Sequence, residues 1–374
     1  MPHLGAAREI KTKPTQHSVK ELREIGIQPD ILLCRSEIPL PPEVKDKIAL
    51  FCNVSTEAVI DALDVQSIYE VPLMFHRGGL DSLIIRLLHL DAAAPDLRTW
   101  QSFSDRFHAA KEAVSIAVVG KYTHLRDAYK SITEAIAHGG AASGANVRID
   151  WVDSERVEMD GAAALLSGAH GILVPGGFGD RGTEGMVQAA RYARERRVPY
   201  FGICLGMQCA VIEFARDVMG LDGADSSEFR PDTPHPVIHL LEEQLTVTQK
   251  GGTMRLGAYE CELKPGSLVQ REYGLPMVRE RHRHRYEFNN DYRARMEEAG
   301  LRVTGVYPKL DLVEIVELPE NPWFVGVQFH PELRSRPADP HPLFRGFVRA
   351  ALEERGRREG APAGARGASR APVA

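Results

Sequence analysis

Residues 202–208 of the 374-residue chain read Gly202-Ile203-Cys204-Leu205-Gly206-Met207-Gln208. The apolar segment 198–203 precedes the cysteine, and a helical pattern follows over residues 207–219. A nucleophile between two glycines at a strand-to-helix turn forms a tight elbow, in which side chains on the glycines would collide. A thiol at a helix N-terminus also feels the positive end of the helix dipole, which favours the thiolate. We therefore predict that Cys204 is a nucleophile rather than a buried structural cysteine.

The segments around this elbow alternate between strands and helices from Ser115 onward. Short apolar runs predict buried strands, and longer amphipathic patterns predict the helices between them. This alternation predicts an α/β fold with an open, mostly parallel sheet and helices on both faces. The predicted strands cover residues 116–119, 147–152, 171–174, 198–203, 312–318 and 323–329, and the predicted helices cover residues 128–138, 183–197 and 341–353.

A histidine and a glutamate two residues apart follow the last predicted strand, in Val327-Gln328-Phe329-His330-Pro331-Glu332. Residues two apart on an extended segment point the same way, so both side chains can face the cysteine. His330 would take the thiol proton and later protonate the leaving group. Glu332 would hold the imidazole in one tautomer and stabilise its charged form. We predict the catalytic triad Cys204, His330 and Glu332.

A glycine-rich turn, Pro175-Gly176-Gly177-Phe178-Gly179, follows the predicted strand 171–174. Attack by a thiolate on an acyl carbon creates an oxyanion, which needs two preorganised backbone N–H groups. Leu205, directly after the nucleophile, can supply one, and Gly177 can supply the other. The alternatives are a plain strand-to-helix turn and a phosphate-binding loop. The chain contains no G-x-x-x-x-G-K-[ST] sequence, and Gly120-Lys121-Tyr122 lacks the first glycine and the hydroxyl residue.

Composition narrows the class of protein without selecting a function. Hydrophobic residues make up 43% and charged residues 26% of the chain, and the formal net charge is −5. No basic field is therefore available to recruit nucleic acid. No apolar run reaches the ~18 residues of a membrane helix, and the N-terminus has no signal-peptide core. The five cysteines form no CxxC pair, which favours a reducing cytoplasm over disulfides or a zinc cluster, so we predict no metal ligands.

The first 90 residues have a different character from the rest. Residues 31–34 and 48–52 predict two short strands, separated by prolines at 39, 41 and 42. Short helical patterns follow over residues 56–90, among them 81–89. Residues 91–112 are polar and mixed, and we predict a linker there. Residues 353–374 are rich in Ala, Gly, Pro and Arg, which predicts a disordered tail.

PGGFG (175–179), GICLGMQ (202–208) and FHPE (329–332), in this order and spacing, resemble the class I glutamine amidotransferases. GGTMRLG (251–257) and ERHRHRYE (280–287), and the glycine pair 139–140 after DAYKS (127–131), are similar to the amidotransferase domain of the CTP synthase family. KTKPTQHSV (11–19), CRS (34–36) and FCNV (51–54) resemble its nucleotide-binding segment. The resemblance implies a remnant of the synthetase domain over 1–90, a linker over 91–112 and an amidotransferase domain over 113–352.

The resemblance also implies ligands and their residues. L-glutamine would contact Gly177, Leu205, Gln208, Glu228 and Arg285, with Glu228 on its α-amino group. An arginine suits a carboxylate because its guanidinium group can bind both oxygens. The alternative interpretation of RHRHR (281–285) is a run of solvated charges. The loop 251–257 resembles a lid linked to GTP activation and ammonia passage.

UTP or the inhibitor CTP would contact Lys11, Lys13, Gln16 and Lys47, and two lysines two apart on an extended segment suit a phosphate. The complete enzyme of this family would use ATP and Mg²⁺, with GTP as activator, in the cytoplasm. The family's phosphate-binding loop and acidic magnesium ligands lie upstream of the segment where this chain starts. We therefore expect either a truncated synthetase half or a second chain that supplies the missing part. The family's homo-tetramer, or assembly with a full-length or N-terminal synthetase partner, is the expected oligomer.

We expect the remnant 9–90 to expose open sheet edges and apolar faces, and to be partly unfolded in the isolated chain. The segment 241–250 before the lid is expected to be shortened. Two other functions remain open. One is a stand-alone glutaminase or cysteine hydrolase, which has no need of segments 11–19 and 251–257. The other is a non-catalytic regulatory subunit that binds CTP and assembles with a full-length synthase.

Overall fold

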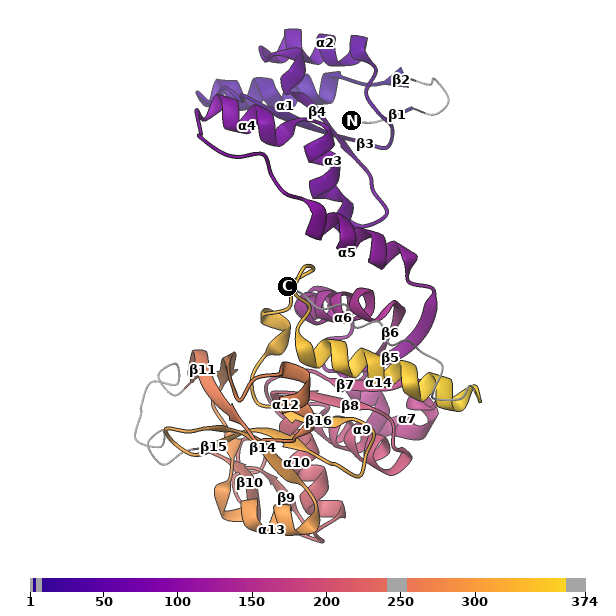
Figure 1. The fold of residues 1–374 in the computed structure, drawn as a ribbon, viewed down its shortest axis with the longest axis vertical. Helices are drawn as coiled ribbons and strands as arrows, with labels where there is room; N and C mark the ends of the chain where they lie inside the picture. Colours follow the sequence, from indigo (N-terminus) through magenta and orange to yellow (C-terminus); the bar gives the residue numbers. More distant parts are fainter. Residues whose placement is uncertain (1–2, 5–8, 241–253, 361–374) are drawn as a thin grey trace. The chain divides into compact units, whose positions relative to one another are not determined.

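The computed structural model describes residues 3–4, 9–240 and 254–360 (Figure 1). The chain divides into two compact units, residues 1–105 and 106–374, and each is described by itself. The predicted shortened segment 241–250, the first three residues of the predicted lid and residues 361–374 of the predicted tail lie outside the described residues.

The first unit is built around a two-stranded parallel sheet of β3 (Leu32–Ser36) and β4 (Val59–Leu63). Helices α1 (Lys13–Glu24) and α2 (Pro42–Cys52) pack on each other beside this sheet. A small apolar core joins these elements. Its buried members are Ile10, Val19, Cys34, Leu40, Ile48, Ala49, Cys52 and Val59. The unit also contains β1 (His3–Leu4), β2 (Glu9–Ile10), α3 (Val71–Arg77) and α4 (Leu80–Leu87).

The strand predicted over residues 48–52 is wrong, because these residues form the end of α2. Pro42 occupies the first turn of the helix, where a fixed φ and a missing N–H are both tolerated. Val44, Ile48 and Cys52 are four residues apart and pack into the same core, which is the spacing of one helix face. The proline run that we read as a chain break therefore starts a helix.

The linker predicted over residues 91–112 contains α5 (Arg98–Ala109). Two aromatic residues of its first half are fixed within the first unit. The Trp100 indole N–H donates to the carbonyl oxygen of Tyr69 at 2.6 Å. Phe103 is fully buried, and its ring packs edge-on against that of Tyr69 with centroids 4.8 Å apart. These contacts anchor the first half of α5, and the linker role of residues 91–112 stays a prediction.

The expected exposure of apolar side chains in the first unit is found on β3 and α2. Leu33 is 51% exposed, Leu50 is 78% exposed and Phe51 is 57% exposed. Whether this unit is partly unfolded in the isolated chain stays a prediction, and amide hydrogen exchange at residues 31–33 would test it.

The second unit contains a nine-stranded sheet in the order β12-β11-β14-β15-β16-β8-β7-β5-β6. The strands from β16 to β6 run parallel, and the others pair antiparallel. The α/β fold class with a mostly parallel site-bearing sheet is therefore confirmed. The strands are β5 (Glu112–Gly120), β6 (Ala145–Asp153), β7 (Gly171–Val174), β8 (Tyr200–Ile203), β11 (Arg255–Leu263), β12 (Met277–His284), β14 (Arg302–Tyr307), β15 (Leu312–Glu317) and β16 (Phe324–Val327).

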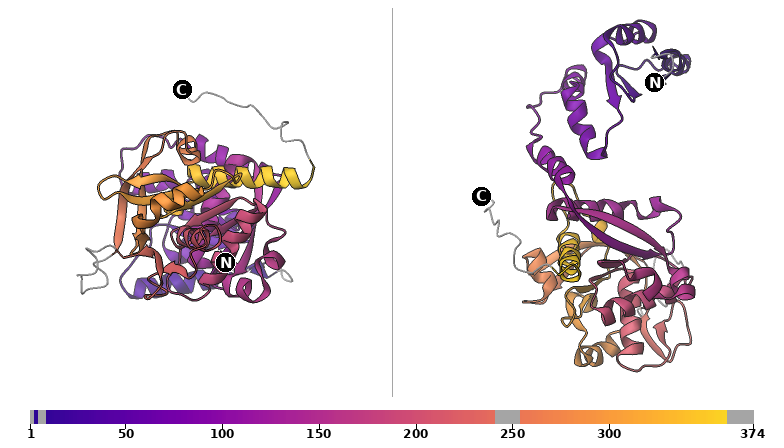
Figure 2. Two further views of the ribbon diagram at one scale, coloured as in Figure 1. Left: turned by 90° about the horizontal axis from the view of Figure 1, so that it is seen from below. Right: turned by 90° about the vertical axis from the view of Figure 1, so that its right-hand side faces the viewer.

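Helices cover both faces of this sheet (Figure 2). On one face lie α6 (Lys130–Ser143) and α14 (Pro342–Arg358), which contact each other. On the other face lie α9 (Thr183–Arg196) and α10 (Leu205–Asp217). Continuous apolar runs form the parallel strands because both of their faces are buried. The remaining elements are α7 (Ser154–Asp160), α8 (Ala162–Leu166), α12 (Leu268–Tyr273), α13 (Arg293–Ala299) and a small sheet of β9 (Ala224–Ser226), β10 (His235–His239) and β13 (Glu287–Phe288).

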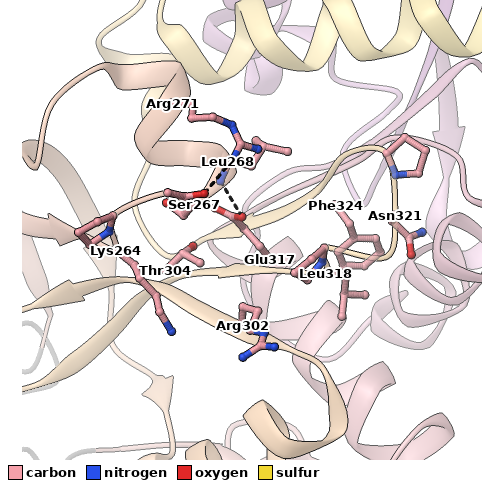
Figure 3. Close-up of a pocket in the computed structure, with 14 residues that line it drawn as sticks. Lys264, Ser267, Leu268, Arg271, Arg302, Thr304, Glu317, Leu318, Asn321 and Phe324 are labelled. Carbon is pink, nitrogen blue, oxygen red and sulfur yellow. Dashed lines mark hydrogen bonds between the residues drawn. The ribbon is translucent and has the colours of Figure 1, made fainter.

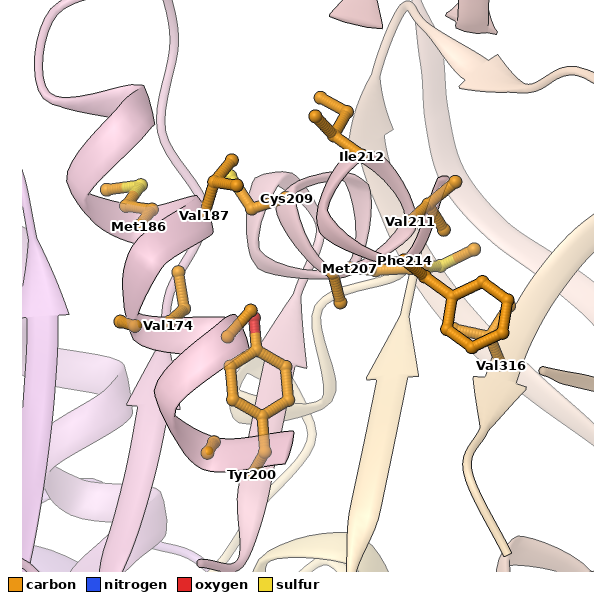
Figure 4. Packing of buried hydrophobic residues seen from close by; sticks show 14 of the residues in the cluster. Val174, Met186, Val187, Tyr200, Met207, Cys209, Val211, Ile212, Phe214 and Val316 are labelled. Atoms are coloured by element: carbon orange, nitrogen blue, oxygen red, sulfur yellow. The ribbon is translucent and has the colours of Figure 1, made fainter. Parts of the chain in front are cut away.

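Successive residues of the parallel strands enter separate cores on the two faces. Along β8, Tyr200 joins the core under α9 and α10, and Phe201 joins the core under α6 and α14. Figure 4 shows the first of these cores, in which Met207 and Phe214 of α10 point towards the strands. The labelled members are Val174, Met186, Val187, Tyr200, Met207, Cys209, Val211, Ile212, Phe214 and Val316.

The tail predicted to be disordered from residue 353 is helical as far as Arg358. The buried carboxylate of Glu354 accepts hydrogen bonds from Arg357 at 2.8 Å and from Arg358 at 2.7 Å. These pairs are spaced three and four residues apart, as ion pairs on one helix face must be. The charges therefore prolong α14 beyond its predicted end.

Candidate active site

The cysteine elbow lies between β8 and α10. Cys204 has φ 53° and ψ −103°, a conformation that residues with side chains rarely adopt. Its backbone N–H donates to the carbonyl oxygen of Val327 at 2.7 Å, which ties the elbow to β16. A Cβ on Gly206 would lie 2.0 Å from the carbonyl oxygen of Val174, and one on Gly202 would lie 2.7 Å from the backbone of Gly206. Both glycines are therefore sterically required.

The predicted base and its partner follow β16, which pairs with β8 in parallel register, Val327 opposite Ile203. Nδ1 of His330 lies 2.7 Å from Oε1 of Glu332. We predicted that these two residues meet on an extended segment, but residues 331–333 form a single 3₁₀ turn. Pro331 favours this turn because its fixed φ suits the first position of a helix. The turn places the two side chains side by side.

The protonation of His330 follows from its two neighbours. Burial by itself would lower the pKa of His330, but the interactions with Cys204 and Glu332 outweigh burial and raise the pKa from 6.5 to about 10. Nε2 of His330 is buried and makes no hydrogen bond to a described residue. Nδ1 is thus held by Glu332, and Nε2 is available to the thiol. The raised pKa favours the imidazolium form of His330.

The predicted oxyanion loop packs directly against this pair. A Cβ on Gly176 would lie 2.9 Å from Cε1 of His330 and 3.5 Å from Cβ of Cys204. A Cβ on Gly177 would lie 3.2 Å from Cδ2 of Leu205. Only a glycine at position 176 leaves room for the imidazole, and the structure brings Gly177 and Leu205 into contact beside Cys204. Their role as oxyanion donors stays a prediction.

Two glutamine side chains form a buried chain behind the thiol. Nε2 of Gln328 lies 3.7 Å from Sγ of Cys204. Nε2 of Gln208 donates to Oε1 of Gln328 and to the carbonyl oxygen of Tyr286, both at 3.2 Å. Gln208 was predicted to contact L-glutamine, and the structure also gives it this supporting position. Sequence reasoning missed Gln328, although it stands within the quoted segment 327–332.

The other two predicted glutamine contacts are neighbours at the far end of the oxyanion loop. Oε1 of Glu228 accepts a hydrogen bond from the backbone N–H of Gly179 at 3.4 Å. Burial raises the pKa of Glu228, and the positive charges of Lys121 and Arg285 oppose that rise. Glu228 is therefore fixed to the loop, and the charge of Arg285 acts on it; binding of L-glutamine by these two residues stays a prediction.

Comparisons with known proteins identify the family of this chain. The family described as glutamine amidotransferase class-I matches residues 124–350, and the family described as CTP synthase N-terminus matches residues 1–90. The CTP synthase of Geobacter metallireducens is 56% identical over 359 residues, which cover 96% of this chain and 67% of that protein. The chain belongs to the CTP synthase family.

Other members of the CTP synthase family give the same result. The CTP synthase of Geotalea uraniireducens is 58% identical over 353 residues, covering 94% of this chain and 66% of that protein. The glutaminase domain of the Trypanosoma brucei CTP synthase, solved with bound acivicin, is 40% identical with a TM-score of 0.61, and the match covers 64% of this chain and 94% of that domain. The chain thus spans about two thirds of the length of its curated relatives.

Three of the four predicted nucleotide contacts lie on two packed helices of the first unit: Lys13 and Gln16 on α1, and Lys47 on α2. Lys11 precedes α1. Lys13 is the first residue of α1, so the extended segment that we predicted for Lys11 and Lys13 is wrong. Pro14 accounts for the difference because proline favours the first turn of a helix. Nε2 of Gln16 donates to Oγ1 of Thr12 at 3.0 Å. Lys47 is exposed on α2. Nucleotide binding by these residues stays a prediction.

The described end of the predicted lid is not a loop, because residues 255–257 begin β11. Arg255 is buried there, with Nη1 3.1 Å from Oε1 of Glu287 and 2.8 Å from Oε1 of Glu314. Burial raises the pKa of both carboxyl groups. The neighbouring charge run on β12 alternates between faces: His282 and His284 are buried, whereas the arginines at 279, 281 and 283 are exposed. The segment that alone would read as a solvated charge run therefore exposes its arginines and buries its histidines.

A cavity of about 360 Å³ lies apart from the triad, between α12, β14 and the segment after β15 (Figure 3). Glu317 sits in its wall and accepts hydrogen bonds from the N–H groups of Leu268 at 3.0 Å and Val269 at 2.9 Å. The carboxylate fixes the start of α12, so this residue has a structural role. None of the predicted site residues lines this cavity.

No helix within residues 9–240 or 254–360 is long and apolar enough to cross a membrane. In the same part of the chain, no three His, Cys, Asp or Glu side chains are grouped so that they could hold a metal ion.

Proposed function

We propose that this chain is the glutamine-hydrolysing half of a CTP synthase and that Cys204, His330 and Glu332 form its catalytic triad. The observation that supports this proposal most strongly is the register of β8 and β16. It sets the strained cysteine elbow beside the turn that holds the His330–Glu332 pair at 2.7 Å. A cysteine, an imidazolium and a carboxylate in this order are the groups that thioester chemistry requires.

The first half of the reaction releases ammonia. The Cys204 sulfur attacks the side-chain amide carbon of glutamine, and the new C–S bond turns the carbonyl oxygen into an oxyanion. The N–H groups of Gly177 and Leu205 stabilise that charge. His330 then gives its proton to the amide nitrogen, the C–N bond breaks, and ammonia leaves. Because the pKa of His330 is about 10, this proton is already on the imidazole before attack.

The second half of the reaction regenerates the cysteine. A water molecule loses a proton to His330 as its oxygen attacks the thioester carbon. A second oxyanion forms in the same place, the C–S bond breaks, and glutamate leaves. Throughout both halves, Glu332 keeps Nδ1 of His330 engaged so that Nε2 faces the sulfur.

Substrate recognition in this proposal uses the far end of the loop. Glu228 binds the α-ammonium group of L-glutamine, and Arg285 binds its α-carboxylate. One carboxylate oxygen of Glu228 already accepts the N–H of Gly179, so the other is available to the ligand. Gln208 supports the site from behind through Gln328.

The ammonia would serve the amination of UTP at C4 to give CTP, driven by ATP with Mg²⁺ and activated by GTP. Lys11, Lys13, Gln16 and Lys47 would contact UTP or CTP. In this proposal the protein assembles as a homo-oligomer, a tetramer in the family, or with a full-length or N-terminal synthetase partner. The reaction would take place in the cytoplasm.

The deciding experiment measures ammonia release from L-glutamine by the purified chain, with and without GTP. Cys204→Ala is the matched control, because it removes only the sulfur. We expect release by the parent chain and none by Cys204→Ala, while L-glutamine still binds to both in calorimetry. Equal release by both chains would refute the triad. Binding without release by a folded parent chain would refute independent hydrolysis.

A further inference from the structure

One lysine lies buried beneath the oxyanion loop and has no role in the reaction described above. Lys121 directly follows β5 and is 3% exposed. Its ammonium group donates to the carbonyl oxygens of Phe178, at 3.3 Å, and of Gly179. It also donates to Oγ1 of Thr183 at 3.3 Å. All three acceptors are neutral and belong to the loop or to the first residue of α9.

The peptide unit between Phe178 and Gly179 is held at both of its ends. Its C=O accepts the Lys121 ammonium, and its N–H donates to Glu228 at 3.4 Å. The C=O and N–H of a trans peptide point in opposite directions. A lysine on one side and a glutamate on the other therefore fix the plane of this peptide. It could not rotate without breaking both hydrogen bonds.

A glycine-rich loop needs such a clamp. Glycine adopts both signs of φ at little cost, so peptide units between glycines reorient easily. An oxyanion donor acts only when its N–H already points at the developing charge. The stem of Lys121 also packs beneath Gly177, where a Cβ would lie 3.6 Å from Cδ of the lysine.

The burial of Lys121 points to such a function. Removing an ammonium group from water costs several kcal/mol, and within the described residues no carboxylate forms an ion pair with Lys121 that would offset this cost directly. Burial accordingly lowers the pKa of Lys121, and the more distant Glu228 is among the charges that oppose this change. A methionine of similar length would fill the same space without that cost, so stability alone does not explain a lysine here.

We infer that Lys121 is a positioning residue that locks the 177–179 loop with the Gly177 N–H directed at the oxyanion. This inference rests on the proposed glutaminase function. Lys121 acts through the backbone of the loop and touches neither the sulfur nor its base.

The test compares Lys121→Met with the parent chain and with Lys309→Met, which removes an exposed lysine of the same unit. We expect Lys121→Met to lower kcat for ammonia release about 100-fold, the effect of losing one oxyanion donor. KM should change by less than about threefold. Alkylation of Cys204 by iodoacetamide, followed by mass spectrometry, should keep its rate because that reaction uses no oxyanion donor. Lys309→Met should match the parent chain in all three measurements.

The outcomes separate this inference from the proposed function. An inactive parent chain would count against the proposed hydrolysis. Amide hydrogen exchange over residues 176–183 would then test whether Lys121 holds the loop, because this measurement needs no enzyme activity. Faster exchange there in Lys121→Met supports the clamp, and unchanged exchange overturns it. An active parent with kcat unchanged in Lys121→Met also overturns it, as does slower alkylation of Cys204. Lys121→Gln, which keeps N–H donors, should fall between the parent and Lys121→Met, and it serves as the second variant if Lys121→Met does not fold.

Discussion

Nδ1 of His330 and Oε1 of Glu332 lie 2.7 Å apart across one 3₁₀ turn. The two residues are close in sequence, and their contact determines the environment of both ring nitrogens of His330. One ring nitrogen is committed to the carboxylate, and the other is buried without a partner among the described residues. The carboxylate and the cysteine together keep a proton on His330 despite its burial. The raised pKa therefore favours a pair that can donate a proton, as the proposed mechanism requires.

Glu332→Gln tests the carboxylate. A neutral amide cannot stabilise the imidazolium, and its NH₂ group can turn towards Nδ1 and favour the wrong tautomer. We expect kcat for ammonia release to fall by roughly 10²- to 10⁴-fold, the range spanned by general acid–base catalysis and by the matching change in serine triads. KM for glutamine should change little, because Glu332 does not contact the α-groups. Steady-state kinetics measures both, and a kcat within threefold of the parent would contradict the assigned role.

The stability of the second unit should depend on pH through His330. The folded pKa of about 10 lies above the unfolded value of 6.5. The stabilisation by the imidazolium is therefore fully present below about pH 6.5 and is lost as the pH rises through about 10. We expect the difference in unfolding free energy between the parent chain and His330→Ala to shrink over this window by a few kcal/mol at most, on the order expected for such a shift. Urea titrations at pH 6, 8 and 10 measure it, and a constant difference would argue against a raised pKa.

Gly206→Ala tests the steric argument for the elbow. The added methyl would lie 2.0 Å from the backbone oxygen of Val174, so β7 and α10 must separate. We expect a loss of about 3 kcal/mol or more in unfolding free energy, at or above the usual cost of overpacking. Ammonia release should be lost as well. Gly168→Ala is the matched control, because no atom lies within 4 Å of the new methyl; it should be nearly neutral in the same denaturation assay.

Arg194→Leu tests the ion pair that joins α9 to α10. Nη2 of Arg194 lies 2.6 Å from Oε1 of Glu213, whose side chain is fully buried. Removing the arginine leaves a buried carboxylate without its partner, and we expect about 3–5 kcal/mol of destabilisation. Arg191→Leu removes an arginine of the same helix that is 53% exposed, pairs with Glu195 at 2.9 Å and lies 3.6 Å from Asp217 of α10, so it removes exposed ion pairs only. An exposed pair of this spacing contributes only about 0.3–0.5 kcal/mol. Similar losses of unfolding free energy in the two variants would contradict the expected difference between the buried and the exposed ion pairs.

The parallel half of the sheet could be predicted from sequence because its strands are continuous apolar runs. β12 could not, because every second residue is an exposed arginine or another surface residue. The segment thus reads as a charge run until its buried histidines are seen. In α2, an apolar run of five residues suggested a strand, although the four-residue spacing from Val44 onward indicated a helix.

The proximity of Cys204 to the His330–Glu332 pair could be predicted from sequence because these residues stand in short motifs whose glycines and proline have steric reasons; their catalytic role stays a prediction. The positions of Lys121 and Gln328 could not be predicted from sequence, because each makes its contact with a residue distant in sequence. Lys121 binds a carbonyl oxygen 57 residues away, and a carbonyl oxygen belongs to every residue. No local pattern marks such a partner. Only the fold brings the lysine beneath the loop.

The pairing of β16 with β8 brings Cys204 and His330 together, so these residues meet only at a late stage of folding. The cysteine sits on an early strand, and Gln328, beside its base, follows 124 residues later. Contacts between segments so far apart are slow to form because a long stretch of chain must first be ordered. Until β16 docks, Cys204 has neither His330 nor the buried amide of Gln328 beside it. In the proposed mechanism, the thiol therefore gains its base only after β16 has paired with β8.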